Sequence, residues 1–400
     1  ELKDIAQKTW KYFDDNLISQ NNYLPPDNYQ LGRKNLLSKT TSSTNIGLGL
    51  MSVISAYDLG FTTLEECIEK LKKCVDTVVR LEKWHGHLYN WYDISTLEPL
   101  NPKFVSTVDS GNLVGYLFVV KEFFRKNNVA DYYKKINELI NKTDFTKLYD
   151  FDKDLFSIGQ NIRDNKLVDS YYDLLASEAR LASFVAICKK DVPYKHWFNL
   201  NRTLTSVDRY KGLVSWSGTS FEYFMPLIVM KTYKYTLLDE TYEFCIYSQK
   251  KYAKKLNVPF GISESAFNLQ DLNNNYQYKA FGIPWLGLKR GLKEEVVVSP
   301  YSSFITLSKN PRDVLKNAQR FKNLGAFEKY GFYDSVDYTP GRVSKDGPAV
   351  VKTYMAHHQA LILLSINNYL NDNILQKRFS ANEEIKIAEL LLQERIPSNI

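Results

Sequence analysis

The chain has 400 residues, of which 44% are apolar and 24% are charged, and its formal net charge is +7. This composition excludes a disordered chain, because it supplies enough apolar side chains to build a core. The lysines are spread along the whole length without the concentrated basic stripe typical of nucleic-acid binding, so no nucleic-acid partner is expected.

The cysteines and the chain start point to a reduced, soluble domain. Cys67, Cys74, Cys188 and Cys245 show no C-x-x-C spacing, and free cysteines in helical apolar patterns behave as small hydrophobic residues. A cytosolic environment is the simplest interpretation. No stretch of about 18 uncharged apolar residues occurs, so no membrane span is expected. The segment Glu1–Asp4 lacks the features of a signal peptide, which indicates a domain excised from something longer or a mature cytosolic start.

Helical periodicity dominates the first eighty or so residues. Leu2–Leu17 places apolar residues at helical spacing among many charges, which predicts an outer helix. Asn45–Leu59 is far more apolar and rich in small residues, and Gly60 is placed to end that helix. Thr62–Glu66 offers a capping box for a charged helix that runs to about Glu82.

The same alternation continues to the end of the chain. Apolar helices are expected at Val108–Phe124, Tyr171–Cys188, Phe221–Met230, Pro300–Leu307 and Ala349–Leu370. Polar or amphipathic helices are expected at Ala130–Asn141, at Asp239–Leu256, from Pro311 to about Leu324, and after Ser380–Glu383.

Alternating apolar and amphipathic helices predict a closed helical architecture. A helix that is apolar nearly all round must be buried, whereas an amphipathic one covers it from outside. We therefore expect an all-α fold, an (α/α)6 toroid of two concentric rings with long loops forming a cleft, built by residues 1–400 as one domain. A helical solenoid would need a sequence repeat of about 30–45 residues, and none is found.

Four long segments between the helices, 85–107, 203–218, 257–282 and 326–347, hold the least ordinary residues. Loops of that length in a compact domain are usually functional. They are rich in aromatic residues, which stack on sugar rings and bind hydroxyl groups through their polar edges. For each of these residues, simple packing of the loop is the alternative role.

Two isolated carboxylates stand out. Glu264 lies among glycine, hydroxyl and aromatic residues in Pro259–Asn268, and Glu178 has a similar setting in Leu175–Phe184. Cleavage of a glycosidic bond requires at least two such groups, one that transfers a proton and one that attacks the sugar or activates the attacking molecule. The alternative for Glu178 is an ion pair with Arg180 or with an arginine of another helix.

Several segments in register resemble the central domain of cyclic β-1,2-glucan synthases. They are Thr44–Leu48, Gly86–Asp93, Val105–Leu113, Ser177–Phe184, Leu213–Gly218, Gly261–Ala266, Gly331–Asp334 and Met355–Gln359, and the match runs from about residue 1 to Pro397. The sequence departs from the family in small ways, with Phe267 where relatives often have Tyr and Ala360 where Gly is common.

The resemblance implies an (α/α)6 relative of the endo-β-1,2-glucanases that cleaves linear β-1,2-glucan and closes it into a ring. It implies a parent protein of the inner membrane with a glycosyltransferase part and a phosphorylase-like part, in which this domain lies on the cytoplasmic side. The alternatives are hydrolysis by an endo-β-1,2-glucanase that uses water, and a non-catalytic module that binds glucan.

Ring closure without net hydrolysis favours a retained intermediate that a sugar hydroxyl resolves. Glu264 is expected to be the nucleophile, because the small residues around it leave close access to an anomeric carbon. Glu178 is expected to be the acid/base, because an apolar helix raises its pKa. The reverse order stays open. Relatives are expected to relay the proton through a substrate hydroxyl, so the two carboxyl groups need not lie about 5 Å apart.

The remaining candidates are expected to bind sugar. Asp109 begins an apolar helix, so capping that helix is its alternative role. Adjacent histidines on a helix point about 100° apart and do not share one ion, so no metal is expected, and no nucleotide motif or other cofactor signal occurs. The full set of expected substrate-binding residues is Asp109, Trp91, Tyr92, Asp93, Trp216, Tyr278, Tyr338, Asp337, His357 and His358.

Overall fold

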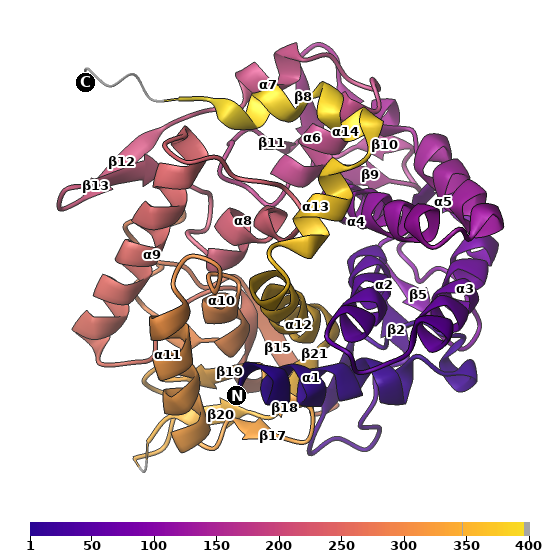
Figure 1. Cartoon of the computed structure of the whole chain (residues 1–400). Coiled ribbons are helices and arrows are strands. Elements are labelled where there is room, and N and C mark those ends of the chain that lie inside the picture. Colours follow the sequence, from indigo (N-terminus) through magenta and orange to yellow (C-terminus); the bar gives the residue numbers. More distant parts are fainter. Residues whose placement is uncertain (346, 396–400) are drawn as a thin grey trace.

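Helices form the body of the protein, as the computed structural model in Figure 1 shows; it describes residues 1–345 and 347–395. The α-helices are α1 (Leu2–Asn16), α2 (Ser43–Asp58), α3 (Leu64–Arg80), α4 (Thr107–Lys126), α5 (Ala130–Lys142), α6 (Arg180–Cys188), α7 (Lys195–Asn199), α8 (Ser220–Phe224), α9 (Leu237–Leu256), α10 (Pro300–Phe304), α11 (Pro311–Asn323), α12 (Ala356–Leu370), α13 (Ile374–Ser380) and α14 (Glu383–Ile387). Single 3-10 turns lie at Ser19–Asn21, Phe145–Leu148, Pro226–Ile228 and Glu389–Gln393.

Short antiparallel strands occupy the segments between the helices. The two-stranded pairs are β1 (Asn28–Gln30) with β21 (Thr353–Met355), β2 (Thr40–Thr41) with β5 (Tyr92–Asp93), β3 (Lys83–Trp84) with β4 (His87–Leu88), β12 (Leu204–Val207) with β13 (Tyr210–Leu213), β14 (Ser265–Gln270) with β15 (Tyr276–Lys279), and β17 (Phe327–Glu328) with β18 (Gly331–Phe332). Three-stranded sheets join β10 (Lys166–Leu167), β9 (Gly159–Asn161) and β6 (Phe104–Ser106); β11 (Tyr171–Tyr172), β8 (Leu155–Ser157) and β7 (Tyr149–Asp150); and β16 (Val297–Val298), β19 (Ser335–Asp337) and β20 (Ala349–Val351).

The apolar helices pack on one another around the centre of the molecule. In the view of Figure 1, α2, α4, α6, α8, α10 and α12 follow one another around the middle, and α2 packs on both α4 and α12. The amphipathic helices α1, α3, α5, α9 and α11 cover this set from outside. The alternation expected from the sequence therefore corresponds to inner and outer helices, because a helix that is apolar all round is stable only when other elements cover it.

Small residues allow the inner helices to approach closely. A Cβ atom at Gly111 of α4 would lie 2.2 Å from the Cβ atom of Ala182 in α6 and 2.4 Å from its Cα atom. A Cβ atom at Gly47 of α2 would lie 2.8 Å from the ring of Tyr116 in α4. Glycine is therefore required at these contacts, since no L-residue fits without moving a helix.

Most helix boundaries agree with the sequence prediction, including the capping box in which Thr63 and Glu66 open α3. Two predictions are wrong at their N-terminal ends. The helix predicted from Tyr171 begins at Arg180, and the helix predicted from Ala349 begins at Ala356. Before α6 only Tyr171–Tyr172 form a strand, β11, and residues 173–179 are irregular or in turns. Before α12 the chain forms β20 and β21, since an apolar run fits a buried strand as well as a helix.

The inner helices present their N-terminal ends to one side of the molecule. The first turns of α2, α4, α8 and α12 border the same cavity. The opposite end is covered by α13, whose Arg378 forms a buried ion pair with Asp58 at the end of α2. The cysteines are buried and unpaired, and among the described residues no helix is long and apolar enough to cross a membrane.

Candidate active site

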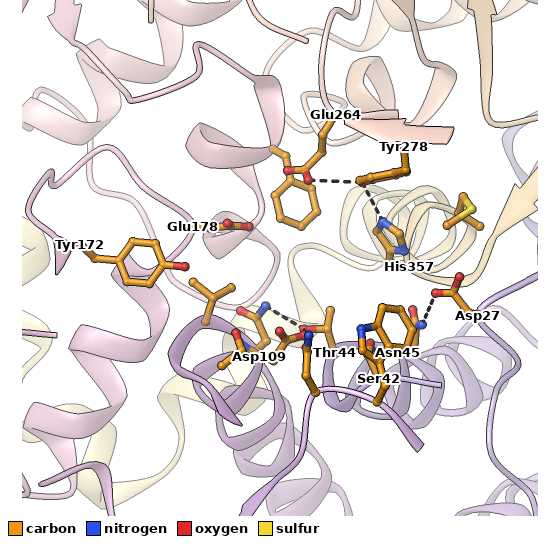
Figure 2. Close-up of a pocket in the computed structure, with 17 residues that line it drawn as sticks. Asp27, Ser42, Thr44, Asn45, Asp109, Tyr172, Glu178, Glu264, Tyr278 and His357 are labelled. Carbon is orange, nitrogen blue, oxygen red and sulfur yellow. Dashed lines mark hydrogen bonds between the residues drawn. The ribbon is translucent and has the colours of Figure 1, made fainter. Parts of the chain in front are cut away.

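A cavity of about 460 Å³ lies at the N-terminal ends of the inner helices (Figure 2). Figure 2 shows the carboxyl groups of Glu178 and Glu264 turned toward the same space. Segments from along most of the chain line the cavity: Asp27, Ser42, Thr44, Asn45, Asn90, Trp91, Ser106, Val108, Asp109, Asn112, Tyr172, Glu178, Phe221, Glu264, Tyr278, Met355 and His357. None of these lining residues is a lysine or an arginine.

Glu264 is held by a segment with no helical structure, just before β14. Gly261 has φ +126°, and a Cβ atom there would lie 2.4 Å from the Ser302 hydroxyl oxygen, so the close turn requires glycine. The Gln249 side chain accepts from the backbone N–H of Ile262 at 2.9 Å and donates to its carbonyl at 2.8 Å. This buried amide pairs with both backbone groups and fixes the segment that presents Glu264.

Glu178 precedes α6 and lies in a turn, whereas the sequence places it within an apolar helix. The Ser177 hydroxyl accepts from the backbone N–H of Ala179 at 3.1 Å and stabilises that turn. Arg180 makes no ion pair with Glu178, because its guanidinium donates to the carbonyls of Leu175 and Tyr223. Among residues 1–345 and 347–395, no arginine of another helix pairs with Glu178 either, so the ion-pair alternative is wrong.

Burial and like charges shift the acidity of both carboxyl groups in one direction. Burial, with the negative charge of Glu264, raises the pKa of Glu178 well above its usual value. Burial, with the charge of Glu222, raises the pKa of Glu264 to about 7. A hydrogen bond from Tyr278 opposes the second shift. At neutral pH the pair is therefore suited to hold one proton between two oxygens of different acidity, which is the condition for dividing acid and nucleophile roles.

A network of aromatic and imidazole groups lies behind Glu264. The Tyr278 hydroxyl donates to Glu264 Oε2 at 3.3 Å and lies 3.1 Å from His357 Nε2 and 3.3 Å from His358 Nε2. His358 Nδ1 lies 2.5 Å from Asp334 Oδ1. Burial lowers the pKa of both histidines well below the usual value, so both rings are neutral.

Asp109 faces the cavity and does not cap its helix. The cap of α4 is Ser106, whose hydroxyl accepts from the backbone N–H of Asp109. The Asp109 carboxylate accepts from the Thr44 hydroxyl at 2.6 Å. The Asn90 amide, oriented to satisfy both of its ends, donates to Asp109 at 3.0 Å and accepts from the indole N–H of Trp91 at 3.2 Å. These bonds hold Trp91, which is 37% exposed, beside a polar wall of the cavity.

Six of the expected sugar-binding residues do not line this cavity. Tyr92 is fully buried and donates to the Glu82 carbonyl, and Asp93 accepts from backbone N–H groups of its own turn. Trp216 is exposed and donates to Asp173. Tyr338 packs against the core, and Asp337 is buried in an ion pair with Arg342. Asp109, Trp91, Tyr278 and His357 line it, and His358 lies directly behind Tyr278.

Sequence reasoning missed several groups of the site. Glu222 of α8 is a half-buried carboxylate that accepts from Ser215, from the backbone of Ser217 and from Thr219. Its capping box with Thr219 is a signal that the sequence carries. Asp27, which accepts from Asn45 at 2.8 Å, follows Pro25 and Pro26 in a loop without any comparable signal.

Comparison with known proteins gives the following matches. Residues 170–383 match the model of the glycoamylase family, described as "Putative glucoamylase". The cyclic beta-(1,2)-glucan synthase NdvB of Rhizobium meliloti (strain 1021) is 32% identical over 528 aligned positions, which cover 100% of this chain and 19% of that protein.

Two solved structures illustrate the similarity of fold. An endo-beta-1,2-glucanase from Chitinophaga pinensis has a TM-score of 0.81 at 15% identity, over 98% of this chain and 97% of the other. A putative glucoamylase from Bacteroides caccae has a TM-score of 0.80 at 17% identity, over 98% of each chain. At such identities the likeness concerns the fold alone. This chain spans about a fifth of the length of its curated relative.

Proposed function

The chain belongs to the glycoamylase family, and we propose that it is a retaining transglycosylase, which cleaves linear β-1,2-glucan and rejoins the chain to itself as a ring. The observation that carries the proposal is the placement of Glu178 and Glu264 in one cavity that no lysine or arginine lines. The proposed substrate rests on the sequence resemblance and on the curated relative whose match covers the whole of this chain. That relative is named as a cyclic β-1,2-glucan synthase.

Each carboxyl group has a role that its surroundings support. Glu178 bonds to no side chain of residues 1–345 or 347–395, so its raised pKa keeps it protonated, as a general acid must be. Glu264 receives the Tyr278 hydrogen bond, which stabilises its ionised form and opposes the rise in its pKa. Glu264 is therefore the nucleophile in this proposal and Glu178 the acid/base.

The reaction then runs in two steps. Glu178 gives its proton to the glycosidic oxygen, directly or through a substrate hydroxyl, while the Glu264 carboxylate attacks the anomeric carbon and the leaving sugar departs. A hydroxyl at the far end of the same chain then attacks the anomeric carbon, which breaks the bond to Glu264 and frees its carboxylate, while the hydroxyl proton passes to Glu178. Trp91, Asp109 and His357 border the space that the sugars would fill.

The finer architecture and the larger context belong to the same proposal. The inner and outer helices support an (α/α)6 toroid formed by residues 1–400 as one domain. We propose that this domain works beside the glycosyltransferase and phosphorylase-like parts of a longer protein on the cytoplasmic side of the inner membrane, since its curated relative is far longer than the matched region.

Product analysis tests the proposal. The purified chain is incubated with linear β-1,2-glucan, and the products are measured by mass spectrometry and by a reducing-end assay. Products that lack a reducing end and are one water lighter than the linear chain support ring closure. New reducing ends without such products indicate hydrolysis, in which water takes the place of the sugar hydroxyl. Unchanged glucan that still binds indicates a non-catalytic module. Glu264→Gln is the negative control for both reactions.

A further inference from the structure

We propose that Asp334 stores the proton that Glu264 must release, and that this proton travels between them through Tyr278 and His358. The inference rests on the proposed function in one respect, namely that Glu264 reacts as a carboxylate. It concerns a positioning residue, since Asp334 lies behind the cavity and acts only through other side chains.

An unbroken line of hydrogen-bonding groups joins the two carboxyl groups. Glu264 Oε2 lies 3.3 Å from the Tyr278 hydroxyl, which lies 3.3 Å from His358 Nε2. On the other side of the ring, His358 Nδ1 lies 2.5 Å from Asp334 Oδ1. A hydroxyl and an imidazole both donate and accept, so each can pass a proton on and receive another.

The far end of this line is fixed in place. Asp334 and His358 are each 1% exposed. The Tyr301 ring stacks on His358 with 3.6 Å between the ring centroids and 13° between the planes. Asp334 Oδ2 accepts from the backbone N–H of Ala266 at 2.7 Å. The imidazole therefore keeps both nitrogen atoms aimed at their partners, as a relay requires.

The line has two balanced proton arrangements. In the first, Glu264 holds a proton that it donates to Tyr278, the Tyr278 hydroxyl donates to His358 Nε2, and His358 Nδ1–H donates to the Asp334 carboxylate. In the second, every proton has moved one place along. Glu264 is then a carboxylate that accepts from Tyr278, His358 carries its proton on Nε2, and Asp334 is protonated and donates to Nδ1. No atom is gained or lost.

The surroundings make the two arrangements close in energy. Burial raises the pKa of Asp334 to about 7, as it does that of Glu264. Among the described residues, no lysine or arginine forms an ion pair with either group. The other titratable groups that face them are Glu178, Glu222, Asp109, Asp27, Tyr301 and His357. A second negative charge is therefore unfavourable, so one proton shared by two sites is the stable condition.

His357 is the competing partner of the relay. Its Nε2 lies 3.1 Å from the same Tyr278 hydroxyl. The two histidines differ at Nδ1, where His358 but not His357 is bonded to a carboxyl group. A proton passed to His357 would leave a charged imidazole in a buried site, which its lowered pKa opposes.

Asp334→Asn mimics the second arrangement. The Asn Nδ2 can donate to His358 Nδ1 as a protonated carboxyl does, and its Oδ1 can accept from Ala266. This variant fixes the tautomer in which Tyr278 donates to Glu264. We expect the pKa of Glu264 to fall by about 1, the size of coupling at which two groups titrate as a pair. The measurement is a carbon-13 NMR titration of labelled carboxyl groups in the full chain, with Glu264→Gln identifying the signal.

Tyr278→Phe separates a relay from simple repulsion between charges. Through a relay, the effect of Asp334→Asn on the pKa of Glu264 should shrink to less than half in the Tyr278→Phe background. An equal effect in both backgrounds, or none in either, would overturn the inference. If Asp334→Asn fails to fold, Tyr278→Phe alone still decides: the Glu264 and Asp334 signals should titrate together in the unmodified chain and independently in the variant.

A control variant and a titration without substrate make this test independent of the proposed function. Asp58→Asn removes another buried carboxylate, one paired with Arg378 at the opposite end of α2, and should leave the Glu264 titration unchanged. The titration needs no substrate. A chain that does not act on glucan would refute the proposed function and leave the relay standing, whereas active enzyme with uncoupled carboxyl groups would refute the relay alone.

Discussion

Arg180 lies two residues after Glu178, yet it forms no ion pair with that carboxyl group. Its guanidinium is buried in the interior, where it donates to two carbonyls and to the Tyr242 hydroxyl. In the described part of the chain, no cation pairs with Glu178, and its pKa is raised by burial and by Glu264. A paired carboxylate would be ionised at neutral pH and unable to act as an acid, so the missing ion pair is what makes the acid role feasible.

Replacing either carboxyl group by an amide should abolish the action on β-1,2-glucan. We expect Glu178→Gln and Glu264→Gln each to lower kcat/KM by about 10³-fold or more, because each removes a proton donor or a nucleophile that no neighbour replaces. Mass spectrometry of the products provides the measurement. Glu69→Gln, on the exposed side of α3, is the matched control and should keep full activity. Near-normal ring formation in one of the two variants would remove that residue from the mechanism.

The activity should follow a bell-shaped pH profile. Glu264 reacts as a carboxylate, and its pKa is about 7, so kcat/KM of the free enzyme should rise with pH up to that region. Glu178 reacts as an acid, so the rate should fall at higher pH, where it loses its proton. The profile is measured with linear glucan well below KM. An acid limb near pH 4.5, the ordinary range of a glutamate, would contradict the environment described for Glu264.

The sequence predicts the inner and outer helices and the two carboxylates. It does not predict which of two adjacent residues in a motif faces the cavity. The apolar and amphipathic helices differ enough in composition to be assigned to inside and outside from their pattern alone. Trp91 directly precedes β5, and successive side chains of an extended segment point to opposite faces, so the choice between Trp91 and Tyr92 depends on the pairing of β2 with β5. That pairing joins segments fifty residues apart along the chain and leaves no local signal.

The same limit applies to Asp334 and Asp337. Both follow β18 in a segment with three aromatic or apolar neighbours, and the sequence favoured Asp337 for binding sugar. The structure pairs Asp337 with Arg342 and places Asp334 against His358. Which carboxylate meets which base depends on the register of β19 between β16 and β20. Buried polar groups find partners across the fold, so a single segment does not reveal them.

Trp91 and Tyr92 should therefore respond differently to substitution. Trp91→Ala removes an exposed ring from the cavity wall and should raise KM by about tenfold, equivalent to about 1.4 kcal/mol, with little change in thermal stability. Tyr92→Phe should leave KM unchanged but lower the free energy of unfolding by about 1–3 kcal/mol, because the backbone groups of Tyr89 and Glu82 lose their partner. Steady-state kinetics and urea unfolding measure the two effects. The opposite pattern would mean that Tyr92 reaches the sugar.

Gly111→Ala tests the close approach of the inner helices. The added methyl group would overlap the backbone of Ala182, which cannot move without shifting α6 and the Glu178 turn before it. We expect a loss of about 1–3 kcal/mol in the free energy of unfolding and a fall in activity as well. Val79→Ala, at an exposed position of α3, is the control and should leave stability and activity unchanged. Gly60→Ala and Gly325→Ala are unsuitable controls, because both glycines have a positive φ that strains alanine. Unchanged stability of Gly111→Ala would show that α4 and α6 lie further apart.

Glu264→Gln should make the folded chain more stable at pH 8 while it removes activity. The folded-state pKa of Glu264, about 7, is above its ordinary value of 4.5. Between these two pH values the folded state holds a proton that the unfolded state has released, so stability falls as the pH rises through that window and stays low above it. Glutamine carries no charge, so the variant should gain about 2 kcal/mol over the unmodified chain at pH 8 and almost nothing at pH 4. Urea unfolding at both pH values measures the difference. A gain of equal size at pH 4 and pH 8 would mean that the cost of holding Glu264 in the cavity comes from its shape and not from its charge.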